Sequence, residues 1–243
     1  MKNLNNNILI TGAQGQVGKD LIKLLKKKNF NLILLDKKKI KDSYFYKIDL
    51  SNVKNLETTL KKINKKFTKI DAIVNLAAVQ VFTDFEKRTF KEIESMLSVN
   101  LTANILISKF IFNKYFKKQK SGKIINISSI FGFSVPNFEN YKKNDRKSSE
   151  TYGASKAAII QLTKYFASYM SKYNINVNCI SPGGIENRTL QTKSFIKRYA
   201  KKVPMNRMAK VREITNLILY LLSPESNYIN GQNIVIDGGY TIK

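Results

Sequence analysis

Three glycines near the start of the chain have the spacing of a phosphate-binding turn. They lie in the run Thr11-Gly12-Ala13-Gln14-Gly15-Gln16-Val17-Gly18, between a short apolar stretch and an amphipathic one. Glycine suits such a run because the chain must turn tightly, approach a pyrophosphate closely and pack a helix against a strand. The start of the following helix would offer backbone N–H groups and the positive end of its dipole. The run predicts a dinucleotide site, although a tight structural turn could have the same composition.

A carboxylate ends the second apolar run of the chain. Asp36 at this place can accept hydrogen bonds from the ribose 2′- and 3′-hydroxyls of NAD, and it would repel the 2′-phosphate of NADP. Lys37 and Lys38 follow directly and could pair with that phosphate. We therefore expect NAD as the cofactor, with NADP as the alternative. The other interpretation of Asp36 is a turn residue at a strand end.

A phenol and an ammonium group are spaced to share one site. Tyr152 and Lys156 stand four positions apart in the run Tyr-Gly-Ala-Ser-Lys, which opens a helical pattern. Residues i and i+4 lie on one face of a helix. Ser129 ends an apolar run upstream, and Asn100 lies in an earlier helical pattern. Each of these residues alone is more often structural than catalytic, so their order along the chain carries the argument.

The elements that must position these residues alternate between strand-like and helix-like patterns. Apolar runs predict strands at 8–11, 32–36, 44–48, 72–76, 123–128, 176–180 and 233–236. Most are continuous, which is typical of strands buried on both faces of a parallel sheet. Amphipathic patterns predict helices over 17–28, 92–116, 151–173 and 211–222. The order predicts a single-domain α/β fold of the Rossmann type, a doubly wound parallel sheet of about seven strands.

The ordered set of motifs resembles the short-chain dehydrogenase/reductase superfamily, in its compact single-domain branch. The matching segments are the turn at 11–18, Asp49-Leu50, Asn75-Leu76-Ala77-Ala78, Asn100, Asn126-Ile127-Ser128-Ser129, Tyr152 to Lys156, Ser181-Pro182-Gly183-Gly184-Ile185 and Gly231-Gln232 to Asp237-Gly238-Gly239. The 12/15/18 glycine spacing is commoner in the larger epimerase and dehydratase branch. Relatives usually show Asn-Asn-Ala-Gly at 75–78, and Asn187, with Thr189 two positions on, stands where a threonine often binds the carboxamide.

The resemblance implies a proton relay of Asn100, Ser129, Tyr152 and Lys156. Tyr152 would exchange a proton with the substrate oxygen, Ser129 would orient that oxygen, and Asn100 would bind, through its backbone, a water that links Lys156 to solvent. Lys156 would also hold the nicotinamide ribose. Free tyrosine has a pKa near 10, so action near pH 7 needs a shift of roughly 3 units, about 4 kcal/mol, which the charges of Lys156 and oxidised nicotinamide favour. The implied cofactor contacts are Gly12, Gln14, Gly15, Gln16, Val17, Asp36, Asp49, Leu50, Asn75, Ala77, Ala78, Tyr152, Lys156, Pro182, Gly183 and Ile185.

Composition excludes several other kinds of chemistry. The chain has no histidine and a single cysteine, Cys179, so an intramolecular disulfide, a histidine base, a histidine metal ligand and a Ser-His-Asp triad are all excluded. We expect no metal site. The start of the chain lacks the pattern of a secretory signal, and no run approaches the ~20 apolar residues of a membrane span. We expect a soluble, cytoplasmic protein without a membrane partner.

The net charge is strongly positive, with 43 Lys and Arg residues against 17 Asp and Glu residues, a balance of +26. Nucleic acid, an anionic membrane or an acidic protein could explain it. The lysines are spread along the whole chain, however, as an AT-rich genome would produce. We therefore expect no nucleic-acid partner, but a general attraction for anionic substrates.

Residues 133–150 are predicted to be a loop inserted at the substrate site. The loop leaves the carboxyl end of the strand that carries Ser129, where α/β folds bind ligands. Its aromatic and cationic residues suit sugar rings and phosphate; they are Phe133, Pro136, Phe138, Tyr141, Lys142, Lys143, Arg146 and Lys147. A solvated surface loop is the alternative. The run 135–141 resembles a subgroup associated with surface-polysaccharide and flagellin-glycan sugar synthesis, the flagellin modification protein A type. A sugar, sugar phosphate or nucleotide sugar is therefore the expected substrate.

Two other functions fit parts of the sequence. A 3-oxoacyl-(acyl-carrier-protein) reductase would suit the basic surface, but the long 133–150 segment argues against it. A non-catalytic regulator that senses a dinucleotide would not need both Tyr152 and Lys156. Members of the family are usually oligomers, and we expect a homodimer or homotetramer built through the helices 92–116 and 151–173 and the last strand. Tyr165, Phe166, Tyr169 and Tyr173 could face a partner subunit or pack in the core.

Overall fold

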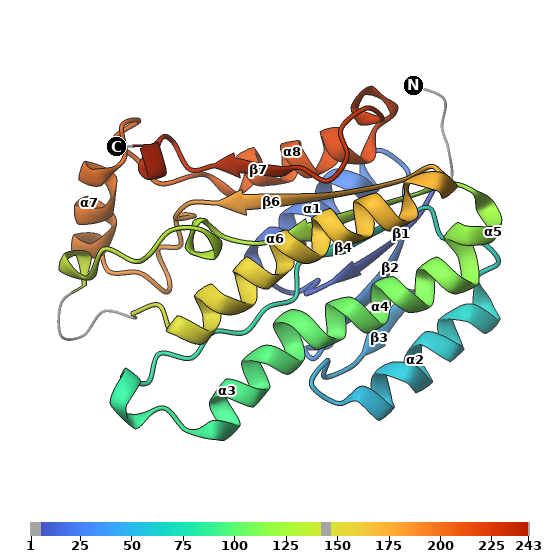
Figure 1. Ribbon diagram of the computed structural model, residues 1–243, viewed down its shortest axis with the longest axis horizontal. Coiled ribbons are helices and arrows are strands. Elements are labelled where there is room, and N and C mark those ends of the chain that lie inside the picture. The colour runs from blue at the N-terminus through green and yellow to red at the C-terminus, as the bar shows by residue number, and fades with distance from the viewer. Residues whose placement is uncertain (1–5, 142–146, 243) are drawn as a thin grey trace.

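The computed structural model describes residues 6–141 and 147–242 as one parallel sheet with helices on both faces (Figure 1). The sheet has seven strands in the order β3-β2-β1-β4-β5-β6-β7, all parallel. The strands are β1 Asn7–Thr11, β2 Asn31–Asp36, β3 Phe45–Lys47, β4 Ala72–Asn75, β5 Gly122–Ile127, β6 Ile175–Pro182 and β7 Asn233–Ile236. The order reverses between β1 and β4, which makes the fold doubly wound and confirms the predicted class.

Two apolar clusters cover the two faces of the sheet. On one face, α2 Val53–Lys66, α4 Ala103–Ile111 and α6 Glu150–Met170 pack side by side (Figure 1). On the other face lie α1 Gln16–Lys26 and α8 Val211–Leu222, which also contact each other. The strands are buried on both faces by these layers, so their apolar runs are continuous.

All seven predicted strands are present, with ends that differ by no more than two residues. The helices predicted over 17–28, 151–173 and 211–222 are present as well, the second one ending in a short 3₁₀ turn, Ser171–Tyr173. Two helices were not predicted: α2 and α7 Lys193–Lys202. The second lies beyond the carboxyl ends of the strands, beside the candidate site (Figure 1).

The helix predicted over 92–116 is longer and less regular than expected. It comprises α3 Phe90–Leu97, a π turn Ser98–Thr102, α4, a second π turn Phe112–Phe116 and α5 Lys117–Gln119. Its length and composition would suffice to cross a membrane, so the expectation that no segment is apolar enough was too strong. In the fold, its buried residues pack in the core beneath the sheet.

The single cysteine lies in the middle of the sheet. Cys179 of β6 is fully buried, between β5 and β7. Burial raises the pKa of its thiol to about 11. The thiol is therefore protonated and enclosed in the native protein.

Candidate active site

Two cavities open at the carboxyl ends of the central strands. The first, of about 480 Å³, is here called the tyrosine cavity, and its lining includes Ser129, Tyr152, Gly183, Ile185 and Asn187. The second, of about 150 Å³, is called the glycine-turn cavity. Its lining includes Gly12, Gly15, Asp36, Asp49, Leu50, Ala77 and Ala78. The structure thus brings most of the predicted site residues to one edge of the sheet.

The glycine turn is a close approach of backbone to backbone. Gly12 has a φ of +69°, and a Cβ there would lie 2.7 Å from the amide nitrogen of Ala77. A Cβ on Gly18 would lie 2.4 Å from the carbonyl oxygen of Gly12. Gly15 is the N-cap residue of α1 and has no side chain to cap the helix. The positions of Gly12 and Gly18 therefore require glycine, and the turn leaves the start of α1 accessible to an anionic ligand.

Asp36 stands at the end of β2 and holds the turn that follows β1. Its carboxylate accepts hydrogen bonds from the backbone N–H groups of Gln14 and Lys38, both at 2.8 Å. Asp49, which lines the same cavity, accepts hydrogen bonds from the backbone and hydroxyl of Ser51, and these hold its pKa below the usual value. Two carboxylates therefore face one small cavity beside the glycine turn.

Val17 and Asn75 are among the predicted cofactor contacts that line neither cavity. Val17 packs against the core cluster of α1 and α8. Asn75 is buried, and its amide donates to the side-chain oxygen of Asn126 at 2.9 Å. Asn126 in turn donates to the hydroxyl of Thr163 on α6 at 2.9 Å. The side chains of Val17 and Asn75 thus contact the protein itself, and their contact with a cofactor stays a prediction.

Ser129 and Tyr152 line the tyrosine cavity, and Lys156 is buried beside Tyr152. The Lys156 ammonium donates to the carbonyl oxygen of Ile127 at 2.8 Å and lies 5.5 Å from the centre of the Tyr152 ring. Burial lowers the pKa of Lys156 to about 8. Burial raises the pKa of Tyr152, while its hydrogen bond with Ser129 lowers it in part. The three groups can exchange a proton with a ligand atom in this cavity.

Asn100 lies in the first π turn of the long helix, Ser98–Thr102, and its side chain bonds the backbone of Val79 in the loop after β4. It accepts from the N–H of Val79 at 2.8 Å and donates to the carbonyl of the same residue at 3.0 Å. It also donates to the hydroxyl of Ser155 at 3.1 Å. Asn100 therefore joins the loop after β4 to the helix that carries Tyr152, without lining the tyrosine cavity itself.

The loop after β6 is tied across the sheet edge to the glycine turn. The Gln16 side chain donates to the carbonyl of Glu186 at 2.6 Å and accepts from the Asn187 amide at 3.1 Å. Thr189 donates its hydroxyl to Asn187 at 2.7 Å. Asn187 thus lines the tyrosine cavity, whereas Thr189 does not line it and instead donates a hydrogen bond to Asn187. Pro182 ends β6 beside this loop.

The unpredicted helix α7 completes one wall. The hydroxyl of Tyr199 accepts from the backbone N–H of Gly184 at 2.7 Å, and its ring stacks on Tyr240 with the ring centres 4.8 Å apart. Burial raises the pKa of the Tyr199 phenol far above its usual value. No motif marks Tyr199 in the sequence, so only recognition of α7 itself would have found it.

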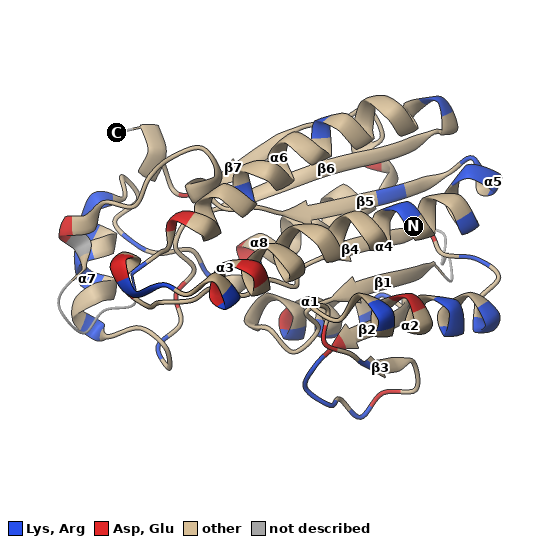
Figure 2. Cartoon of the chain, turned by 60° about the horizontal axis from the view of Figure 1, so that its bottom comes forward, with Lys and Arg blue, Asp and Glu red and all other residues tan. Residues whose placement is uncertain are grey.

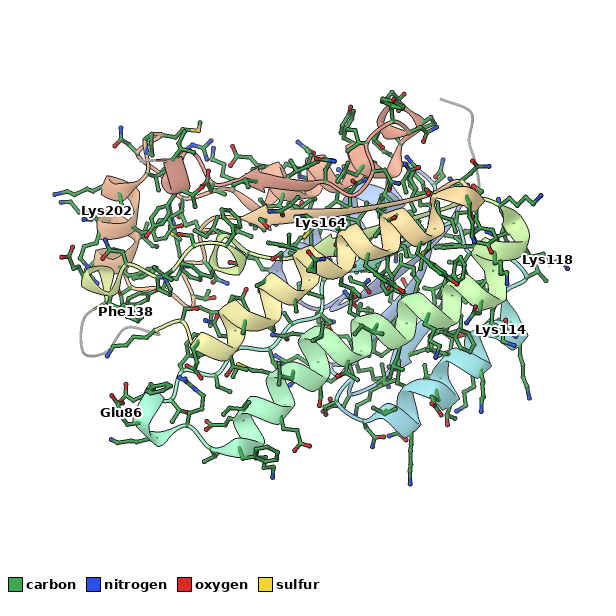
Figure 3. All side chains as sticks on the ribbon, viewed as in Figure 1. Glu86, Lys114, Lys118, Phe138, Lys164 and Lys202 are labelled. Atoms are coloured by element: carbon green, nitrogen blue, oxygen red, sulfur yellow. The ribbon has the colours of Figure 1, made fainter. Side chains whose placement is uncertain are left out.

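The predicted substrate loop divides between two places. Tyr141 lines the tyrosine cavity and contacts Phe195 of α7, with the ring centres 5.6 Å apart. Phe133, Pro136 and Phe138 instead line a separate apolar cavity of about 650 Å³. Figure 3 places Phe138 beside α7, at the same end of the molecule as Lys202. Among the predicted cations, Lys147 pairs loosely with Asp84 at 3.9 Å, and Lys142, Lys143 and Arg146 lie outside the described residues.

Comparison with known proteins agrees with this geometry. The sequence profile described as "Enoyl-(Acyl carrier protein) reductase" matches residues 35–241. A post-translational flagellin modification protein A from Campylobacter coli is 31% identical, over 97% of this chain and 98% of its own. A 3-oxoacyl-(acyl-carrier-protein) reductase from Buchnera aphidicola is 28% identical, over 98% of each chain.

A solved structure gives the same result in three dimensions. The short chain dehydrogenase from Leptospira borgpetersenii, crystallised with bound NAD+, superposes with a TM-score of 0.89 at 34% sequence identity. The match covers 97% of this chain and 92% of the other. Sequence and fold thus match over nearly their whole lengths.

Proposed function

Since the chain belongs to the short-chain dehydrogenase/reductase family and is an NAD(P)-dependent oxidoreductase, we propose that it transfers hydride between nicotinamide and a carbonyl or alcohol group of a sugar-like substrate. The observation that carries this proposal is that Ser129 and Tyr152 line one cavity next to the glycine turn, with the buried Lys156 ammonium beside the Tyr152 ring. The relative with bound NAD+ supports the cofactor.

The residues of the glycine-turn cavity fit a dinucleotide. A side chain at Gly12 or Gly18 would collide with backbone atoms, so the space beside this turn stays open to a pyrophosphate at the start of α1. Asp36 and Asp49 can accept hydrogen bonds from ribose hydroxyls and the adenine edge. The carboxylate of Asp36 favours NAD, with NADP as the alternative because Lys37 lines the same cavity. The nicotinamide supplies or accepts the hydride.

The relay residues divide the work of proton transfer. Tyr152 donates a proton to the carbonyl oxygen as hydride arrives at its carbon, or takes the proton from the alcohol in the reverse direction. Ser129 donates a hydrogen bond to the same oxygen and orients it. Lys156, charged near pH 7, favours the phenolate and holds the nicotinamide ribose. Asn100 keeps the loop after β4 against the helix that carries Tyr152.

A sugar, sugar phosphate or nucleotide sugar is the proposed substrate class. Aromatic faces and uncharged hydrogen-bonding groups line the tyrosine cavity, and this mixture suits a ring that carries hydroxyl groups. The flagellin modification protein among the relatives supports a role in glycan synthesis. The second candidate, a 3-oxoacyl-(acyl-carrier-protein) reductase, is favoured by the Buchnera relative. We also propose that the enzyme is cytoplasmic and a homodimer or homotetramer.

The test is a screen of cofactor oxidation. Purified protein is mixed with NADH or NADPH and a set of sugar ketones, with acetoacetyl thioesters as the competing substrates. We expect turnover with the sugars, preferentially with NADH. The variant Tyr152→Phe should still fold and bind cofactor, but should lose at least ~100-fold in rate. Turnover of thioesters alone would show that the substrate is a 3-oxoacyl thioester and not a sugar. Near-normal activity of Tyr152→Phe would refute the proposed proton relay.

A further inference from the structure

Two polar side chains of the tyrosine cavity have no part in the relay. Gln80, in the loop after β4, donates from its amide nitrogen to the hydroxyl oxygen of Ser148 at 2.9 Å. Both residues line the cavity that contains Ser129 and Tyr152. The bond leaves the amide oxygen of Gln80 as an acceptor and the Ser148 hydroxyl as a donor, so the pair contains the two functions that a bound hydroxyl group needs.

The position of this pair is fixed by the elements that fix the relay. Gln80 follows Val79, whose backbone N–H and carbonyl are both held by Asn100. Ser148 is buried and precedes Ser149, which caps α6 by accepting from the N–H of Tyr152 at 3.2 Å. The direction of the Gln80–Ser148 pair relative to Tyr152 is therefore set before any ligand binds, as specific recognition requires.

The other side-chain amides that line the cavity are hydrogen-bonded to other groups of the protein. Gln16 and Asn187 bond each other across the sheet edge. The Gln191 amide accepts from the N–H of Asn187 and donates to the carbonyl of Ile185. Among the described residues that line this cavity, none carries a charge. Recognition by the described lining thus takes place through neutral donors and acceptors, which suit hydroxyl groups better than carboxylates.

We propose that Gln80 and Ser148 bind the hydroxyl on the carbon next to the reacting carbonyl, so that the substrates are α-hydroxy carbonyl compounds and the products of reduction are vicinal diols. This inference rests on the proposed function, since it takes the carbonyl oxygen to lie between Ser129 and Tyr152. A cavity that pairs with a substrate hydroxyl rejects the analogue without it, because its own buried polar groups are then left unpaired.

The test compares substrates that differ by this one hydroxyl. The pairs are acetoin with butan-2-one, and D-glucose with 2-deoxy-D-glucose in the oxidative direction. For the wild type we expect kcat/KM at least ~100-fold higher for the hydroxylated member of one pair. Gln80→Leu and Ser148→Ala should each reduce that ratio at least ~10-fold, with little change for the member that lacks the hydroxyl.

The control is Gln191→Leu, the same change in the same cavity at an amide that bonds only backbone in the described structure. It should affect both members of a pair alike and leave the ratio unchanged. The inference is overturned if the wild type turns over other carbonyls in the screen but discriminates in neither pair, or if the Gln80 and Ser148 variants keep the wild-type ratio. Absence of turnover with every carbonyl would instead reject the proposed function.

Discussion

Burial of Lys156 destabilises the charged form of its side chain, and its place beside Tyr152 gives a reason for that burial. The ammonium is buried, 3% exposed, and bonds one backbone carbonyl. Burial lowers its pKa to about 8, yet the charged form is the one that favours the Tyr152 phenolate. The protein thus holds a cation where solvation is poor, beside the residue that we propose as the proton donor.

Lys156→Met should reveal this cost through the pH dependence of stability. Between pH 8 and 10.5 the unfolded lysine is protonated and the folded one is not, so the stability of the wild type rises with pH through this window. Below pH 8 the full penalty is present. The free energy of unfolding of Lys156→Met minus that of the wild type should therefore decrease by about 3 kcal/mol from pH 7.5 to 10.5.

Urea denaturation at several pH values measures this difference. Lys164→Met removes an exposed lysine of the same helix, which points into solvent (Figure 3), and controls for the general loss of one positive charge. If the free energy of unfolding of Lys156→Met changes with pH in parallel with that of Lys164→Met, burial does not lower the pKa of Lys156.

Sequence motifs predicted the relay residues, but not several of the other residues that line the tyrosine cavity. Ser129, Tyr152 and Lys156 belong to ordered motifs, and the fold brings them together. Ser148 falls within the loop predicted over 133–150, but without a motif of its own. Gln80 and Tyr199 lie at positions without any motif, where only the path of the chain brings them to the cavity. No local pattern could have identified them, because their neighbours in space come from distant parts of the sequence.

At the scale of elements, the start of α6 is held from three sides. Ser149 caps the helix, Asn100 bonds Ser155 within it, and Glu150 in its first turn pairs with Arg88 from the loop before α3. The Arg88 side chain is only 5% exposed. These anchors fix the position of the first turn of α6, which carries Tyr152.

Loss of the cap should affect both stability and catalysis. Ser149→Ala should lower the free energy of unfolding by about 1 kcal/mol. It should also lower kcat, because the N–H that it leaves unpaired belongs to Tyr152. Asn52→Ala is the matched control, since Asn52 caps α2 by accepting from the N–H of Asn55 at 3.0 Å.

The control variant should lose similar stability and keep the wild-type kcat. Thermal denaturation and steady-state kinetics on both variants decide the matter. Equal kcat for the two would mean that the cap of α6 has no influence on the position of Tyr152.

The seven strands were predictable because layers on both faces keep their apolar runs unbroken. The helices α2 and α7 were missed for the opposite reason. Each is rich in lysine and buries few side chains: α2 buries Leu56, Leu60 and Ile63, and α7 buries Tyr199. Their apolar residues do recur with helical spacing, but the many lysines lower the apolar content of both segments, so no apolar run marked them as elements. The π turns around Asn100 depend on packing and have no signature in composition.

At the scale of the whole molecule, positive charge is spread over most of the surface. Figure 2 shows lysine and arginine on nearly every helix, and Figure 3 places Lys114, Lys118 and Lys202 at the edges of the molecule. A nucleic-acid partner would favour one concentrated basic face. The dispersed pattern agrees with a composition effect across the chain rather than a single binding surface.

The aromatic stripe on α6 divides between core and surface. Phe166 is buried, whereas Tyr165 and Tyr169 are 61% and 52% exposed and stack on each other with the ring centres 6.1 Å apart. If the enzyme assembles through this helix, Tyr169→Glu should convert the wild-type oligomer into a smaller species, because a carboxylate would be buried at the contact. Analytical ultracentrifugation measures the change.

Val53→Glu is the control for that experiment, since Val53 is 39% exposed on α2, away from the stripe. It should leave the oligomer intact. An unchanged sedimentation coefficient for Tyr169→Glu would place any subunit contact on another face.

The enclosed thiol of Cys179 can report unfolding of the protein. The chain has no other cysteine to compete for a thiol reagent, and the thiol lies against the sheet face that α6 covers, near Thr163 and Lys156. Modification must wait until that face is uncovered, so its rate measures how often this part of the core opens. A cysteine placed on the surface would, for the same reason, take up a fluorescent label at that site alone.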